Sequence, residues 1–304
     1  MTTKNFSLPN LKVLTYGGAG AVNDPDIIEY LNSLDINFVT DLGNELISQK
    51  FLNKYRSWIT STKLNDYTGL EGFTHSAYSN ATTESFDKFY MTNSQRRFRC
   101  FRGEYMYHQL TWRNCWPNWQ YIEDDLDINI NDAVVISLPF ADTGNLHHHY
   151  RALLERCTEL NVPVLVDCAY ANICSGITFD FSYPCITDVA FSLSKFAPLA
   201  AYARIGMRLS RVDSDDPLFV LNKTNYTNRM SAWLGSKIID RFGPDYIVEK
   251  YKPTQIEFCK ELGATPSQSV IFGLGDNDYN QYNRGAGNNR LCFFRYLHQG
   301  TLPS

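Results

Sequence analysis

Three short apolar runs and one amphipathic stretch dominate the pattern between residues 131 and 195. The length and β-branched content of the apolar runs predict buried strands; the runs are NDAVVISLPF (131–140), VPVLVDCAY (162–170) and TDVAFSLSK (187–195). Between the first two runs, HHHYRALLERCTELN (147–161) repeats apolar residues at helical spacing. Continuous apolar strands joined by a helix predict a mainly parallel sheet covered by helices on both faces.

The pattern changes after residue 212. Residues 215–242 and 243–262 predict two helices, and SVIFGLG (269–275) and RLCFFRYL (290–297) predict two short strands. We therefore expect an α/β protein with three parts: an N-terminal segment (1–65), a large domain with the mainly parallel sheet (66–212) and a small α+β C-terminal domain (213–304).

The composition is ordinary for a soluble globular protein, with 304 residues, 44% hydrophobic and 20% charged. The net charge of −4 provides no general attraction for nucleic acid or an anionic membrane, so we expect neither as a partner. The N-terminus, MTTKNFSLPNLKV, lacks the basic start and apolar core of a signal peptide, and the eight cysteines include no C-x-x-C pair. The expected location is the cytoplasm.

Two local runs suggest binding functions, and neither is favoured. RRFRCFR (96–102) alternates arginine with phenylalanine, which predicts a strand with one charged face; an RNA-binding patch is the alternative. HHH (147–149) suggests a metal, but adjacent residues at a helix start point in different directions and cannot all face one ion. No metal site is predicted.

A single lysine, Lys195, stands in the apolar stretch FSLSKFAPLAAYAR (191–204), with no charged neighbour between Asp188 and Arg204. Such a lysine either extends its ammonium to water or is buried, and burial lowers the pKa of the amine and makes it a nucleophile. Ligands of open parallel sheets bind beyond the carboxyl ends of the strands. Asp167 and Lys195 both follow such ends, which favours a functional role for the lysine.

A cofactor with an aldehyde, a ring nitrogen and a phosphate needs a lysine, a carboxylate and a set of hydroxyl, amide and guanidinium donors. Lys195 and Asp167 satisfy the first two needs, and Ser192, Ser194 and Arg204 are candidate phosphate ligands. YSNATTESFDKFY (78–90) places small and hydroxyl residues before a predicted helix, which is typical of a phosphate site and also of a plain helix cap.

Together, LPFADTG (138–144), VPVLVDCAY and FSLSKFAPLAAYAR resemble the large-domain motifs of fold-type-I pyridoxal-phosphate enzymes, the aspartate aminotransferase superfamily of class I/II aminotransferases. The resemblance extends from about Asn80 to Met207 and is weak but traceable to the chain end. It implies that Lys195 carries the cofactor as a Schiff base and then moves the substrate proton. It also implies that Asp167 pairs with the pyridinium nitrogen and that Tyr170 donates to the ring 3′-oxygen.

The resemblance implies further contacts and a homodimer with shared active sites. Tyr105 would stack on the cofactor ring and Arg290 would bind the substrate α-carboxylate; Arg295 is the rival of Arg290, and the odd spacing would point it to the opposite strand face. The N-terminal segment would contribute to the substrate side. The phosphate would be bound by Ala81, Thr82, Ser192, Ser194 and Arg204.

Three departures leave the reaction open. Ala141 replaces the usual asparagine, Pro198 stands in the usual glycine region between lysine and arginine, and the chain is shorter than most members. We expect a pyridoxal-phosphate-dependent enzyme that acts at the α-carbon of an amino acid or related amine, first of all an aminotransferase. A lyase, cyclase, hydroxylase or racemase, or a cofactor-binding protein that has lost turnover, stays open.

A dinucleotide-dependent oxidoreductase is the distant alternative. Residues 11–41 have the outline of strand, glycine turn, helix and strand, with Asp41 at the end. However, Gly18 and Gly20 are not followed by a third glycine, because Asn23 stands in its place, and Pro25 interrupts the expected entry into the helix.

Overall fold

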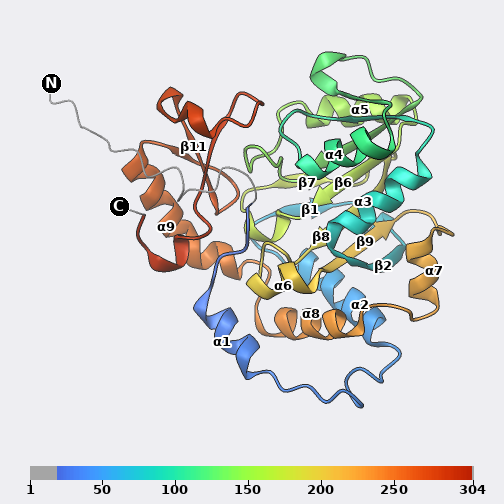
Figure 1. The fold of residues 1–304 in the computed structure, drawn as a ribbon, viewed down its shortest axis with the longest axis vertical. Helices are drawn as coiled ribbons and strands as arrows, with labels where there is room; N and C mark the ends of the chain where they lie inside the picture. Colours follow the sequence, from blue (N-terminus) through green and yellow to red (C-terminus); the bar gives the residue numbers. More distant parts are fainter. Residues whose placement is uncertain (1–18, 303–304) are drawn as a thin grey trace.

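The computed structural model describes residues 19–302, and its main feature is a seven-stranded sheet with the order β2-β9-β8-β6-β5-β3-β4 (Figure 1). β9 runs antiparallel to both of its neighbours, whereas the pairs β8–β6, β6–β5, β5–β3 and β3–β4 are parallel. The strands are β2 (His75–Asn80), β3 (Arg97–Cys100), β4 (Trp119–Tyr121), β5 (Asp132–Ser137), β6 (Val164–Cys168), β8 (Ile186–Ser192) and β9 (Ile205–Ser210).

Helices cover both faces of this sheet, as the apolar runs predict. In β5, Ala133 and Val135 belong to a core cluster with α3 and α4, whereas Val134 and Ile136 belong to the cluster that contains α2, α5 and α8. Successive side chains of a strand face opposite sides, so two-sided burial explains the unbroken apolar sequence. The helices are α2 (Ile47–Thr60), α3 (Ala81–Thr92), α4 (Met106–Cys115), α5 (Tyr150–Glu159), α6 (Pro198–Ala203), α7 (Pro217–Lys223) and α8 (Arg229–Arg241).

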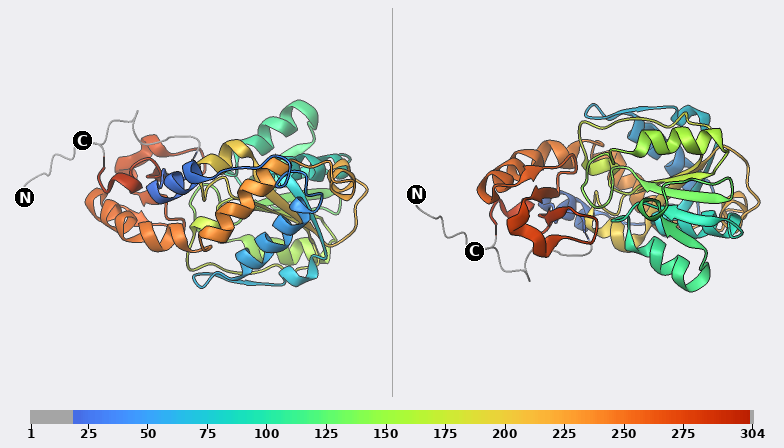
Figure 2. Two further views of the ribbon diagram at one scale, coloured as in Figure 1. Left: turned by 90° about the horizontal axis from the view of Figure 1, so that it is seen from below. Right: turned by 90° about the horizontal axis from the view of Figure 1, so that it is seen from above.

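A smaller unit lies at one end of the molecule in every view (Figures 1 and 2). It combines α9 with the antiparallel sheet β10-β11-β12. The N-terminal helix α1 is attached to α9 through Asp24. This carboxylate accepts a hydrogen bond from Tyr251 (2.6 Å) and forms an ion pair with Lys250 (2.6 Å). The remaining strands β1 and β7 pair with each other beside the large sheet. The bounds are α1 (Pro25–Ser33), α9 (Tyr246–Leu262), β1 (Asp66–Thr68), β7 (Thr178–Asp180), β10 (Thr265–Pro266), β11 (Phe272–Gly275) and β12 (Asn289–Cys292).

Two sequence expectations differ from the structure. The helix predicted over residues 215–242 is two helices, α7 and α8, separated at Asn225, whose φ of 59° is left-handed and ends a helix. The strand predicted over 290–297 ends at Cys292, because the chain turns from Phe293 into a short 3-10 helix. α7 contacts β2, and α8 contacts α2 and β9, so the boundary at residue 212 stays a prediction.

The dinucleotide-binding outline lacks its second strand. Residues 11–18 lie outside the described residues, and Asp41 lies in a turn instead of ending a strand. Pro25 does not interrupt the helix entry but occupies its first position, where a proline is favourable, and the Asp24 side chain caps the helix. Within the described part of the chain, every helix is too short or too polar to span a bilayer.

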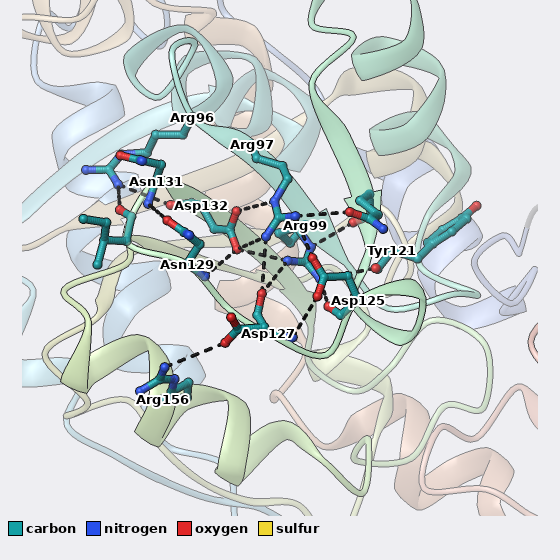
Figure 3. Close-up of polar contacts among 12 residues, drawn as sticks. Arg96, Arg97, Arg99, Tyr121, Asp125, Asp127, Asn129, Asn131, Asp132 and Arg156 are labelled. Atoms are coloured by element: carbon teal, nitrogen blue, oxygen red, sulfur yellow. Dashed lines mark hydrogen bonds and ion pairs between the residues drawn. The ribbon is translucent and has the colours of Figure 1, made fainter.

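The basic run includes β3, and the charged face of this strand is turned toward the buried Asp132 and the more exposed Asp125 (Figure 3). Arg97 Nε lies 2.6 Å from Asp132 Oδ1, and Arg99 Nη1 lies 3.0 Å from Asp132 Oδ2. Arg99 and Asp132 are fully buried, and Arg97 also pairs with Asp125 at 2.8 Å. These arginines therefore tie β3 to β5 and the loop before it and do not form an open basic surface for RNA.

Replacing Asp132 with asparagine is expected to lower the free energy of unfolding by about 3–5 kcal/mol, because two arginines lose a buried counter-charge. Guanidinium unfolding of both proteins measures the change. Asp240→Asn, which removes an exposed ion pair with Lys54, is the control and is expected to cost less than about 1 kcal/mol. Equal effects of the two substitutions would contradict the structural role of Asp132.

Candidate active site

A cavity of about 230 Å³ opens at the carboxyl ends of β6 and β8. Its wall is built from the loops after these strands, the first turn of α3, the loop before α4 and the smaller unit. The structure brings into this wall every predicted site residue except Ser192: Ala81, Thr82, Tyr105, Asp167, Tyr170, Ser194, Lys195, Arg204 and Arg290.

Ser192 lies behind the cavity wall. Its buried hydroxyl donates to the carbonyl of Ile205 (3.1 Å) and accepts a hydrogen bond from the backbone N–H of Ser194 (3.1 Å). These two bonds connect the end of β8 to β9 and hold the turn that carries Ser194. Ser192 therefore does not line the cavity but orients Ser194, which does.

Lys195 follows β8 and extends into the cavity wall. Its Nζ donates to the backbone carbonyl of Ala19 and lies 5.5 Å from the centroid of the Tyr170 ring. Burial lowers the pKa of this amine, an effect that the nearby Tyr105, Cys292 and Asp167 partly oppose. The neutral, nucleophilic form is thus more accessible than in an exposed lysine.

Asp167, in β6, is the buried carboxylate of the same wall, with 4% of its surface exposed. Burial raises its pKa to about 7, although a hydrogen bond from Ala169 N–H to Oδ1 (3.0 Å), the charge of Lys195 and a hydrogen bond from Thr82 stabilise the ionised form. A cation placed against this carboxylate would keep it ionised at neutral pH.

Two residues with left-handed backbone meet in the cavity wall at the start of α3. Ala81 has a φ of 59° and Arg204 a φ of 55°, and the N–H of Ala81 donates to the carbonyl of Arg204 (3.1 Å). Such conformations are unfavourable for residues other than glycine and cluster at ligand sites. Gly206 permits the approach, because a Cβ there would lie 2.7 Å from the Cα of Ala81.

The wall at the start of α3 has the donors of an anion site. Ala81, Thr82 and Thr83 form the first turn of the twelve-residue helix α3 and line the cavity. Arg204 donates to the Thr83 hydroxyl (2.6 Å). Asn80 directs its side-chain amide to Glu84 (3.0 Å), so within the described chain it does not cap the helix. Helix N–H groups beside a guanidinium suit a phosphate.

Arg290 enters the cavity wall from β12 of the smaller unit. The side chain is buried, donates from Nη1 to the carbonyl of Ala141 and lies 4.3 Å above the centroid of the Phe272 ring. Arg295, its rival in sequence, lies beyond the strand and lines a different cavity, 5.5 Å from the Phe294 ring centroid. Tyr105 is half-exposed at the cavity edge.

Sequence reasoning missed two polar residues of the wall. Thr83 is the third residue of the same small and hydroxyl run, so the predicted phosphate site could have included it. Arg284 enters from a loop between Tyr282 and β12, and no periodicity or motif around it identifies such a position.

No protein-family model and no curated protein sequence matches this chain. Solved protein structures, however, do match it. Tyrosine aminotransferase from Leishmania infantum is 13% identical (TM-score 0.62; 98% of this chain and 97% of that one), and alanine aminotransferase from Pyrococcus furiosus is 13% identical (0.59; 90% and 84%). The PLP-bound C-S lyase from Staphylococcus hominis is 12% identical (0.60; 99% and 95%). The chain therefore shares the fold of these aminotransferases and of this lyase, as its motifs predict.

Asp167 makes the stability of the cofactor-free protein depend on pH. Because its folded pKa is raised above the unfolded value, the folded state binds more protons between about pH 4 and 7, and stability falls as the pH rises through this window. Asp167→Asn removes this loss. We expect the variant to gain roughly 1–4 kcal/mol over the parent between pH 4 and 8 in denaturant unfolding. If the free energy of unfolding depends on pH in the same way in the parent protein and in Asp167→Asn, the proposed ionisation of a buried Asp167 is contradicted.

Proposed function

We propose that the protein is a pyridoxal-phosphate-dependent enzyme acting at the α-carbon of an amino acid, and that it is an aminotransferase. The observation that carries this proposal is that Lys195 and Asp167 line the same cavity. Lys195 follows the end of β8, and Asp167 lies near the end of the neighbouring strand β6. The buried amine and buried carboxylate face the same space as the anion site at α3.

The wall offers a matching group for each functional part of the cofactor. Lys195 would hold the aldehyde, Asp167 the protonated ring nitrogen and Tyr170 the ring oxygen. The strained meeting of Ala81 and Arg204 provides a cradle for the phosphate. The hydroxyl and guanidinium donors around that cradle are those of Thr82, Thr83, Ser194 and Arg204.

When bound, pyridoxal phosphate supplies an electron sink that stabilises negative charge on the substrate α-carbon. Asp167 contributes by holding positive charge on the ring nitrogen, since its ionised carboxylate is stabilised by a cation there. Lys195, released from the aldehyde by the substrate amine, would take the α-proton on Nζ as a neutral amine and return it as an ammonium, and its lowered pKa favours the neutral form. Arg290 binds the substrate α-carboxylate and fixes the α-carbon beside Lys195.

A lyase or another reaction of the same carbanion is the second candidate, and Ala141 is the observation that favours it. The alanine methyl offers no hydrogen bond to the ring oxygen or to the substrate carboxylate, so both groups rely on Tyr170 and Arg290. The products separate the two candidates, because only transamination leaves the cofactor in its aminated form and releases an oxo acid.

We also propose that the active enzyme is a homodimer in a reducing compartment, the cytoplasm. Met106 in the cavity wall (54% exposed) and Tyr202 (85% exposed), which follows the wall residue Ala201, are exposed apolar side chains that a second copy would cover. All eight cysteines are free thiols and seven are buried, which supports a reducing compartment.

Pyridoxal phosphate is expected to give the purified protein a near-visible absorption band, and borohydride should then fix the cofactor to the peptide that contains Lys195. Lys195→Ala should lose both signals, because the amine that forms the bond is absent. Lys252→Ala is the matched control: Lys252 is also a lysine whose pKa is lowered by burial, but it donates to the carbonyl of Ser267 (2.9 Å) outside the cavity. Absorbance and peptide mass spectrometry measure the outcome.

Addition of amino donors to the loaded enzyme tests the reaction. Aminotransferase activity predicts conversion of the band to that of the aminated cofactor and stoichiometric release of oxo acid in a single turnover. An unchanged band with every donor would leave a binding protein, and elimination products would favour the lyase. Failure of the parent protein to acquire any band would contradict the proposed function as a whole.

A further inference from the structure

The free amine of Lys195 is held by the N-terminal part of the described chain. Its Nζ donates to the backbone carbonyl of Ala19, which lies 176 residues earlier. Residues 19–24 have no regular secondary structure and lead directly into α1. Ala19 lines both the cavity of Lys195 and a second cavity of about 730 Å³. The segment 19–24 therefore passes between two cavities at the point where Lys195 contacts it.

The other end of this segment is attached to the smaller unit. Asp24 is fully buried, accepts a hydrogen bond from Tyr251 of α9 (2.6 Å) and forms an ion pair with Lys250 of the same helix (2.6 Å). Near the first end, Gly20 packs against Phe294, because a Cβ on Gly20 would lie 2.6 Å from the ring carbon Cε2. The segment thus connects the amine of Lys195 with α9.

The contact with Ala19 needs Lys195 as a free amine. A protonated lysine has three N–H donors, and a charged donor makes a strong hydrogen bond. When the neutral amine reacts with an aldehyde, a C=N bond forms, and the two amine hydrogens leave with the aldehyde oxygen as water. The nitrogen then keeps at most one N–H, which lies in the plane of the double bond. Ala19 is buried (8% exposed), so loss of its donor is unfavourable for the carbonyl in this position.

We propose that residues 19–24 form a strap that the free amine of Lys195 holds at the cavity, and that reaction of this amine with the cofactor aldehyde releases the strap. This inference rests on the proposed function, because it takes the aldehyde as the reaction partner of Lys195. Asp24 connects the strap to α9, so the smaller unit responds to the chemical state of the lysine. The strap returns whenever Lys195 is a free amine again.

Hydrogen exchange of the peptide that contains residues 19–24 tests the strap in the full-length protein. Exchange of a local segment follows the equilibrium between its closed and open forms. Incubation with pyridoxal phosphate should make this exchange about tenfold faster, because a hydrogen bond from a charged donor is lost. Pyridoxamine phosphate should leave the exchange unchanged. It has the same ring and phosphate but an amine in place of the aldehyde, so Lys195 stays free.

Two lysine variants separate the contact from filling of the cavity. Lys195→Met removes the donor and retains most of the side-chain length, so exchange over residues 19–24 should be about tenfold faster than in the parent, with or without either cofactor form. Lys252→Met is the matched control and should leave this exchange unchanged. Lys252 is also a lysine whose pKa is lowered by burial, but it donates to the carbonyl of Ser267 (2.9 Å) and lines neither cavity.

Equal effects of the two cofactor forms, or equal exchange in Lys195→Met and the parent, would overturn the strap. The strap and the proposed function fail separately. A protein that acquires no cofactor band, but whose Lys195→Met variant exchanges faster over residues 19–24, would contradict the proposed function and support the holding contact with Ala19. A protein that acquires the band and still exchanges slowly over these residues would contradict the strap alone.

Discussion

The register of the parallel strands is the constraint on which the cavity depends. β5 pairs Ser137 with Asp167, and β6 in turn pairs Asp167 with Ala190 of β8, so that these strands end at one edge. Ligands of open parallel sheets collect at such an edge. A slip of one residue in β6 would turn Asp167 to the other face of the sheet and remove the carboxylate from the cavity. The close approach at Gly206 then brings the start of α3 to the same edge.

Burial of opposite charges at this edge links the fold to its chemistry. Desolvation raises the pKa of Asp167 to about 7 and lowers that of Lys195, so burial disfavours the charged form of both groups. Burial of these two groups lowers the stability of the unliganded protein. A ligand with a cationic ring nitrogen and an aldehyde would offset this loss, because the nitrogen pairs with Asp167 and the aldehyde reacts with Lys195. The smaller unit contributes Arg284 and Arg290 to the cavity wall. The positive charge that these two side chains bring to the cavity therefore depends on how the two units pack.

The parts of the fold that could be predicted from the sequence are those in which local pattern and tertiary burial agree. The strands β5, β6 and β8 are buried on both faces, so their sequences are continuously apolar and identify both the sheet and the edge where Lys195 lies. The division at Asn225 could not be predicted, because the apolar spacing continues on both sides of it. Arg284 could not be predicted either: its place depends on Asp142, 142 residues earlier in the chain, and on turns with left-handed glycines. The position of Ser192 behind the wall depends on a hydrogen bond to β9, which periodicity does not show.

A crystal structure of the protein after incubation with pyridoxal phosphate tests the central claim most directly. The account predicts continuous density between Nζ of Lys195 and the cofactor, with Asp167 at the ring nitrogen. The phosphate should lie between the first turn of α3 and Arg204. A cofactor bound elsewhere, or in this cavity with its phosphate at Arg290 and its ring nitrogen away from Asp167, would contradict the account.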